Sequence, residues 1–445
     1  MQRAPLRGIV VRHWRPMDSQ TITAVLAIGA IVFIGFFGNM IFQRFRIPDV
    51  LILVALGMIL GPDVLGNSLG LITNDTLRGI NQYQDFLLSL ALIIVLFDGG
   101  LSLDVRSVLE SMKLSSFITI LTLLAEITLV ALALFAFLHM NLLLAFVVGA
   151  IVGGTGEAVV IPIANRMRIK PQTKSMLIME SVITDVLVIV IALTLMQVIV
   201  IGDFNAFIVA KDLAVKFLVG AAIGFAAGIA WLFVLQKLQN QPLSYMITVG
   251  ALFLVAGFVE KISSSAAVAA LAFGLAIGNR RFIKRWLTSI SLKLASDAHI
   301  HQFHLEITFF VRTFFYVYIG LMFRFSTFTL THLIIGIGII GIIVTVRRIT
   351  SLVAYRIGDL DKSDSNALFS LMPRGIAAAV LATMPAALLV ATSVWEARFD
   401  PMILNVVLIV ILGTTMLTTV LSFTTEKGID KENRRHLQKR LAERS

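Results

Sequence analysis

Two carboxylates lie five residues apart inside one long apolar run, in the segment Glu180–Asp185. On a helix of 3.6 residues per turn they point roughly 140° apart, so they face different surroundings. We expect Glu180 to pair with an arginine of a neighbouring helix and Asp185 to face an ion path. Ser181 and Thr184 would supply neutral oxygens beside it. Such oxygens suit a hard cation such as Na⁺, and a carboxylate out of water can bind a proton instead.

Other ionisable side chains also fall inside apolar runs. Each costs roughly 2.5–3.5 kcal/mol at a bilayer centre on insertion scales, so each needs a partner, a water-filled cavity or a function. The opposite charges nearly balance, which indicates that several pair, and a structural salt bridge stays the alternative for Asp185. The others are Asp98, Glu126, Glu157, Arg312, Arg347, Arg348 and Arg374.

The composition identifies the surroundings of these charges as lipid. Of 445 residues, 58% are hydrophobic and 14% are charged, where a soluble domain has about a quarter charged. The continuous apolar runs predict helices rather than a barrel. The chain has no cysteine, which excludes disulfides and thiolate metal sites. Its net charge of +11 is scattered over short loops, which favours lipid contacts over nucleic acid.

We predict an all-α polytopic membrane protein with about thirteen spans, no cofactor and no enzymatic site, because no phosphate-binding loop, nucleotide fold or hydrolytic triad is recognisable. The spans are approximately Thr21–Ile41, Pro48–Leu60, Phe86–Leu103, Leu114–Leu138, Leu142–Ile163, Met176–Val200, Leu213–Leu235, Leu243–Val259, Ala266–Ile277, Ile307–Phe323, Leu333–Tyr355, Ala367–Leu389 and Met402–Phe423.

The basic residues predict the orientation. The loops after odd-numbered spans, with the C-terminal tail, hold 23 lysines and arginines, and the opposite side holds 9. The positive-inside rule therefore places the C-terminus in the cytoplasm and the N-terminus outside the cell membrane. Residues 1–19 form an N-terminal segment, in which Met17 is an alternative start, and residues 426–445 form a short, charged, helical cytoplasmic tail.

The pattern of spans indicates an inverted repeat of spans 1–6 and 8–13, with the seventh as connector. The two shortest spans, the second and ninth, then correspond. The fifth and twelfth also correspond, and both are interrupted, by Gly153–Glu157 with Pro162 and by Pro373–Gly375 with Pro385. Paired interrupted spans are typical of a secondary transporter whose binding site lies at the membrane midplane.

Six motifs in order resemble the monovalent cation:proton antiporter superfamily, on its NhaP/NHE sodium/proton exchanger side, over nearly the whole chain. Asp98 replaces the glutamate of the family's Phe-Glu-Gly-Gly-Leu motif, and Thr184 replaces the asparagine of its Glu-Ser-x-x-Asn-Asp motif. The six are Arg46-Ile47-Pro48 with the run ending at Pro62, Phe97–Leu101, Glu180–Asp185, Ser263–Asn279, Arg312–Phe315 with Gly320-Leu321, and Pro373–Ile376.

The resemblance implies a homodimer with a moving core domain, at about 114–200 and 331–425, and a dimerisation scaffold at about 20–104 and 207–325. Unwound stretches of the fifth and twelfth spans would cross near the ion site. Asp185 would bind Na⁺ or a proton in competition, with Thr155 and Ser181 as further Na⁺ ligands. Glu180 would pair with Arg347 or Arg348, with a slight preference for Arg348.

The remaining core charges have less definite roles. Arg374 is expected to pair with an acid or with helix-end carbonyls rather than to contact the ion. Glu126 either lines the core or forms a structural pair. One departure concerns the site itself, because the family's Thr-Asp-Pro is here Thr155-Gly156-Glu157. Glu157 either substitutes for the lost charge, or accepts protons itself, or marks an altered selectivity.

We therefore predict antiport of a monovalent cation against H⁺ by alternating access. Na⁺ is the preferred ion and Li⁺ or K⁺ are alternatives. Because Thr184 before Asp185 is neutral, a single titrating carboxylate favours an electroneutral 1:1 exchange. Glu157, as a second carboxylate, weakens this prediction of the stoichiometry. A cation channel and an organic-anion transporter that uses Arg374 are the rival functions.

Overall fold

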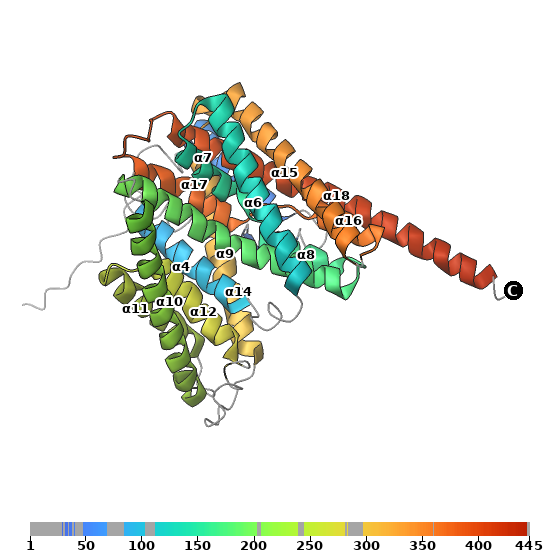
Figure 1. Ribbon diagram of the computed structural model, residues 1–445, viewed down its shortest axis with the longest axis horizontal. Coiled ribbons are helices and arrows are strands. Elements are labelled where there is room, and N and C mark those ends of the chain that lie inside the picture. Colours follow the sequence, from blue (N-terminus) through green and yellow to red (C-terminus); the bar gives the residue numbers. More distant parts are fainter. Residues whose placement is uncertain are drawn as a thin grey trace, which may run out of the picture.

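The computed structural model describes residues 48–68, 84–102, 112–202, 206–238, 244–280, 297–358 and 360–442, with isolated positions between 29 and 40 and residue 283. The described residues form helices joined by turns and short extended stretches, and none of them is in a β-strand (Figure 1). This confirms the predicted all-α class. In the described part of the chain, seven helices are long and apolar enough to cross a membrane by length and composition.

Over its described residues, each predicted span from the second to the thirteenth overlaps with helix, and the fifth and twelfth are each divided into two helices. The first falls largely outside the described residues, so the number thirteen stays a prediction. The helices are α2 (Asp49–Leu60), a π-helical turn (Pro62–Gly66), α4 (Gln84–Ser102), α6 (Met112–Leu138), α7 (Leu142–Gly153), α8 (Glu157–Arg166), α9 (Pro171–Ile201), α10 (Ala206–Lys237), α11 (Ser244–Lys261), α12 (Ala266–Gly278), α14 (Asp297–Met322), a 3₁₀ turn (Phe325–Thr327), α15 (Leu330–Ile357), α16 (Lys362–Ser370), α17 (Ile376–Leu389) and α18 (Phe399–Ala442).

The last helix does not stop at the predicted start of the tail. Helix α18 passes through residue 426 without a break and continues to Ala442, and its end projects from the body of the molecule (Figure 1). The predicted N-terminal segment and the alternative start at Met17 lie outside the described residues.

Small residues bring helices into close contact. A Cβ atom added to Gly224 of α10 would lie 2.2 Å from the carbonyl oxygen of Ala269 on α12. Gly220 and Gly228 face α12 in the same way, as small-xxx-small packing predicts. Helices α10, α11 and α12 group together in one part of the molecule (Figure 1).

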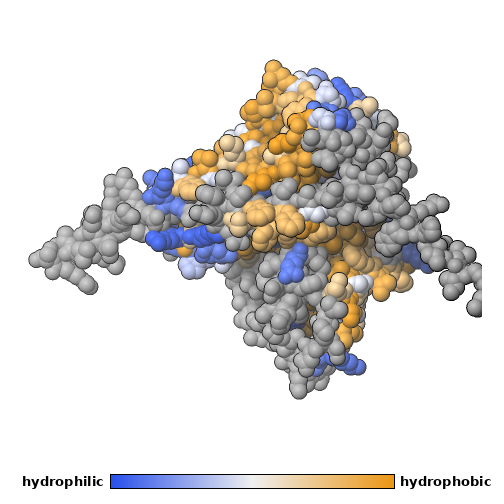
Figure 2. Space-filling view, turned by 180° about the vertical axis from the view of Figure 1, so that it is seen from behind, coloured by the Kyte–Doolittle hydropathy of each residue, from blue (hydrophilic) through white to orange (hydrophobic). Residues whose placement is uncertain are grey.

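The outer surface is apolar, as expected for a surface in contact with lipid. Large apolar side chains stand exposed, including Phe137 at 83% and Leu254 at 77%. Figure 2 shows apolar residues spread over the face of the molecule, with hydrophilic residues mostly toward its edges. Because water-soluble proteins seldom leave so much apolar surface open, this surface supports a membrane-spanning protein.

Two of the predicted spans are broken in their middle, where the sequence has its glycines and prolines. Residues Gly154–Gly156 separate α7 from α8, and Leu371–Gly375 separate α16 from α17. Gly154 and Leu371 both have extended backbone angles. The breaks cross each other, because the Gly156 amide donates to the Pro373 carbonyl at 2.7 Å. A Cβ on Gly156 would lie only 2.5 Å from the Cα of Gly375, so the crossing has no room for a side chain.

Candidate ion-binding site

Asp185 lies beside this crossing. It is on α9, the residue is 9% exposed, and its Oδ2 accepts a 3.4 Å hydrogen bond from the amide of Glu157, the first residue of α8. Gly375, directly before α17, is close enough that an added Cβ would lie 3.3 Å from the same oxygen. The carboxylate therefore faces the N-termini of two half-helices, whose partial positive charges favour an anion.

Threonine hydroxyls bind the backbone of the unwound stretches. Thr184 accepts from the Thr155 amide at 3.1 Å, and its hydroxyl lies 3.2 Å from the Thr155 hydroxyl. Thr414 and Thr418 of α18 accept from the amides of Arg374 and Met372 in the second break. In a membrane interior a free backbone amide is costly, so these hydroxyls make the interrupted helices tolerable.

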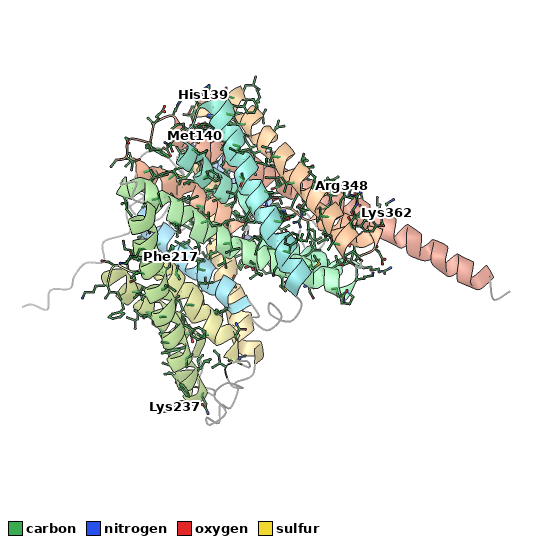
Figure 3. All side chains as sticks on the ribbon, in the orientation of Figure 1. His139, Met140, Phe217, Lys237, Arg348 and Lys362 are labelled. Atoms are coloured by element: carbon green, nitrogen blue, oxygen red, sulfur yellow. The ribbon has the colours of Figure 1, made fainter. Side chains whose placement is uncertain are left out.

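Glu180 pairs with Arg347 of α15, and both side chains are buried. The same guanidinium donates to the carbonyls of Leu368 at 2.7 Å and Leu371 at 2.9 Å, at the end of α16. The preference for Arg348 is therefore wrong. Arg348 is exposed and lies over the Phe369 ring, on the part of α15 near Lys362 (Figure 3).

Arg374 forms a second buried pair, with Glu126 of α6. Its Nη2 lies 2.9 Å from Glu126 Oε2, and its Nη1 donates to the Gly154 carbonyl at 2.7 Å, at the end of α7. The guanidinium is fully buried. Arg374 thus contacts both an acid and a helix-end carbonyl, which is the placement the sequence analysis favours for it.

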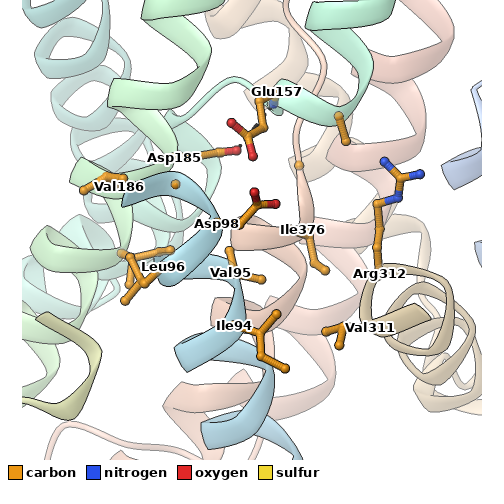
Figure 4. Close-up of a pocket in the computed structure, with 14 residues that line it drawn as sticks. Ile94, Val95, Leu96, Asp98, Glu157, Asp185, Val186, Val311, Arg312 and Ile376 are labelled. Carbon is orange, nitrogen blue, oxygen red and sulfur yellow. Dashed lines mark hydrogen bonds between the residues drawn. The ribbon is translucent and has the colours of Figure 1, made fainter. Parts of the chain in front are cut away.

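A cavity of about 30 Å³ opens at Asp185, large enough for a water molecule or a largely dehydrated ion. Three carboxylates line it: Asp98 of α4, Glu157 of α8 and Asp185 of α9. Figure 4 shows these three side chains near one another, with Arg312 of α14 on the other side of the opening from Asp185. The remaining wall is mostly aliphatic.

The predicted neutral ligands are absent from this wall. The Ser181 hydroxyl donates to the Ile178 carbonyl one turn back on its own helix. Thr155 and Thr184 bond to each other, and Thr184 also donates to the Glu180 carbonyl. None of the three is among the residues that line the cavity. Hydroxyls buried on a helix commonly turn back to its carbonyls, which helical spacing alone does not reveal.

Glu157 is the residue whose role the sequence analysis left open. Its side chain lines the cavity beside Asp185, and its Oε2 has no hydrogen-bond partner among the described residues. No three Asp, Glu, His or Cys side chains in the described part of the chain converge closely enough to hold a metal ion by themselves. A cation in this cavity would therefore need backbone oxygens or water as further ligands.

Asp49 is an acid that the sequence analysis missed. It is the first residue of α2, it is 2% exposed, and it accepts from Arg312 at 2.9 Å. In the sequence, Asp49 looks like an ordinary acid at the start of a helix. The signal that points to it is Arg312, an arginine within an apolar run that needs a partner.

The chain matches the family described as "Sodium/hydrogen exchanger, transmembrane" over residues 29–427. It belongs to this family. The family is one of transporters, and the chain is a multi-pass membrane protein.

The sequence is similar to two proteins named as potassium/proton antiporters. It is 28% identical to the K(+)/H(+) antiporter NhaP of Alkalimonas amylolytica over 275 residues, which are 60% of this chain and 45% of that protein. It is also 28% identical to NhaP2 of Shewanella sp. (strain MR-4) over 276 residues, 59% of this chain and 45% of that one. The match thus spans just under half the length of these relatives.

The fold is similar to that of a solved exchanger. The sodium proton antiporter MjNhaP1 from Methanocaldococcus jannaschii superposes with a TM-score of 0.73 and 19% identity, over 91% of this chain and 99% of that one. A second structure of the same protein gives a TM-score of 0.68. At this identity the likeness establishes the fold, which is that of the family.

Proposed function

We propose that this protein exchanges a monovalent cation for protons across the cell membrane, with Asp185 as the group for which both compete. The observation that carries the proposal is the place of Asp185, at the crossing of two broken helices and on the wall of a cavity. Broken helices near the midplane are the usual setting of a transporter's ion site.

The chemistry follows from one carboxylate in a confined space. The N-termini of α8 and α17 stabilise its charged form, and either a proton or a cation neutralises it. Because Glu126 and Glu180 are each neutralised by an arginine, they do not compete for the ion. One carboxylate that alternates between one proton and one cation gives an electroneutral 1:1 exchange. Glu157 is then the acid that replaces the family's missing aspartate.

The movement would occur along the cavity. The cavity is lined by α8, α9 and α17, which belong to the core domain predicted from the sequence, and by α4 and α14, which belong to the predicted scaffold. Alternating access is a displacement of one set against the other around a fixed site. The scaffold would also supply the homodimer contact, with the N-terminus outside the cell and the C-terminus in the cytoplasm.

We propose Na⁺ as the cation, with Li⁺ and K⁺ as the alternatives. Carboxylate, carbonyl and water oxygens suit a small hard cation, and a structural neighbour is a sodium antiporter by name. The relatives named for K⁺ make potassium the strongest alternative. Of the predicted Na⁺ ligands, Asp185 is retained. Thr155 and Ser181 would contribute only in a conformation that turns their hydroxyls toward the cavity.

The test is transport by the purified protein in liposomes with an imposed pH gradient and an internal pH dye. Adding Na⁺, Li⁺ or K⁺ should collapse the gradient, and Asp185→Asn should abolish this. Asp400→Asn, at an exposed aspartate at the start of α18, is the matched control and should transport normally.

Two outcomes would overturn the proposal: no cation collapses the gradient, or Asp185→Asn transports like the unchanged protein. Cation flux that proceeds without opposite proton movement would indicate the channel. With a K⁺/valinomycin clamp, exchange rates that depend on membrane potential would contradict the 1:1 stoichiometry.

A further inference from the structure

Among the described residues, Arg312 is the one arginine or lysine on the wall of the carboxylate cavity, and the proposed mechanism gives it no role. Its Nη2 is bound to Asp49, outside the lining. Its Nε has no hydrogen-bond partner among the described residues. The arginine is therefore only partly used by the fold, on a helix that faces Asp98, Glu157 and Asp185 (Figure 4).

The ion pair of Arg312 and Asp49 is positioned by the close packing of α14 against α2. A Cβ on Gly320 of α14 would lie 2.4 Å from the Val54 carbonyl and 2.8 Å from the Cα of Gly57, so α2 and α14 touch backbone to backbone. Asp49 and Arg312 each lie eight residues before these glycines. Eight residues of helix rise about 12 Å, so two parallel helices that touch at these glycines also bring the acid and the arginine to the same level.

The same face of α14 carries a second polar group without an evident structural use. Tyr316 follows Arg312 by one turn and is fully buried, yet its hydroxyl has no hydrogen-bond partner in the described part of the chain. A buried hydroxyl without a protein partner indicates water or an ion nearby, since leaving it bare is costly.

We infer that Arg312, restrained by Asp49, is the fixed counter-cation of the cavity and competes there with the transported cation. The inference rests on the proposed exchange at Asp185. When the site is empty, the guanidinium attracts the carboxylates of α8 and α9 and holds the core helices against the scaffold. A bound cation or proton removes that attraction and frees the core to move. Arg312 is thus a positioning residue that sets affinity and limits uncoupled movement.

Asp49 determines how strongly the charge of Arg312 acts on the cavity. Its carboxylate lies 2.9 Å from the guanidinium and so partly neutralises it. Removing the charge of Asp49 should therefore strengthen the effect of Arg312 on the cavity, and removing the charge of Arg312 should abolish it. The two members of one ion pair are expected to shift cation affinity in opposite directions.

The experiment measures the apparent KM for Na⁺ and the maximal rate in liposomes, together with proton leak in the absence of any exchangeable cation. Arg312→Gln should lower the KM on the order of tenfold and raise the leak, because a competing charge is lost. Asp49→Asn should raise the KM. Arg312→Lys, which keeps the charge, should stay near the parent value, and Arg398→Gln, at an exposed arginine, is the control.

A purely structural ion pair predicts a different pattern. Both single variants would then lower stability and maximal rate together, with the KM unchanged or shifted the same way, and that result would overturn the inference. Should Asp49→Asn fail to fold, the double variant Asp49→Asn/Arg312→Gln buries no unpaired charge. It should show the low KM and raised leak of Arg312→Gln, and a double variant with the parent KM would contradict the role.

The failure of this inference differs from a failure of the proposed function. If the unchanged protein shows no cation-dependent proton movement, the exchange itself is wrong. If it exchanges normally and Arg312→Gln leaves both KM and leak unchanged, only the role of Arg312 is wrong.

Discussion

The two broken helices both leave backbone groups without helical partners at the break, but they carry different charges there. The break between α7 and α8 is neutral and is followed at once by the acid Glu157, whereas the break between α16 and α17 contains the base Arg374. The preceding half-helix ends in both cases against an arginine. Arg374 binds the Gly154 carbonyl of the first, and Arg347 binds the Leu368 and Leu371 carbonyls of the second.

The comparison separates structural charges from functional ones. At both half-helix C-termini, where partial negative charge favours a cation, an arginine is bound and a glutamate balances it. At both N-termini Asp185 supplies a carboxylate, and Glu157 adds a second one at the start of α8. The arginine–glutamate pairs hold the crossing together, and Asp185 remains as the proposed exchange group.

The largest expected effect comes from removing one of the two arginines. Arg347→Ala and Arg374→Ala each leave a glutamate buried without its partner, which should lower the free energy of unfolding by about 3–5 kcal/mol. Thermal unfolding in detergent measures it. Arg398→Ala, which breaks an exposed pair with Glu396, should change stability by about 0–1 kcal/mol. Equal stability of all three variants would contradict the structural assignment.

Crowding the crossing is expected to have the next largest effect. Gly156→Ala places a methyl 2.5 Å from the Cα of Gly375, so the two breaks must separate, at a typical overpacking cost of about 1–3 kcal/mol. Exchange should be lost while the protein still folds, because the shift displaces the α8 amide from Asp185. Gly338→Ala is the control, since nothing lies within 4 Å of its added methyl. Normal exchange by Gly156→Ala would show that the crossing does not need its close contact.

The difference between the breaks is tested at Glu157. Glu157→Gln keeps the side chain's size and removes its charge from the cavity wall. If Glu157 replaces the family's missing aspartate, the KM for the cation should rise on the order of tenfold. Glu396→Gln, at an exposed glutamate, should not change it. Unchanged kinetics of Glu157→Gln would make the residue structural.

The smallest effects are expected from the threonines. Thr184→Val and Thr414→Val each remove the acceptor of one backbone amide in a break, which should lower stability by about 1–3 kcal/mol. The two losses should be similar because the two breaks are supported in the same way. Thr345→Val, at an exposed threonine bonded only within its own helix, should matter less. A larger loss in just one break would show that the breaks are not equally supported.

The fold was largely predictable because its signals are local. Long apolar runs predict spans in lipid, and glycines and prolines inside two of them predict the breaks. The pairing of Glu180 with an arginine of the eleventh span was also predictable, since a buried charge needs a partner. Which arginine it is depends on the rotation of α15, and neighbouring residues differ by about 100° around a helix.

The details of the site were less predictable because they depend on contacts between distant segments. Ser181 has the spacing of a ligand, but its hydroxyl bonds to its own helix. Asp98 reads as one of several core charges, and only the packing of α4 against α9 brings it to the cavity of Asp185. Asp49 lies 263 residues from Arg312 along the chain, so nothing local identifies the pair.

The most direct test of the account is proton release on cation binding. Purified protein in a weakly buffered detergent solution with a pH indicator is titrated with Na⁺, and then with K⁺, at a pH where the site is partly protonated. Competition of both ions for Asp185 predicts about one proton released per cation bound, and none from Asp185→Asn. Cation binding without proton release, or equal release from Asp185→Asn, would contradict the claim that one carboxylate serves both ions.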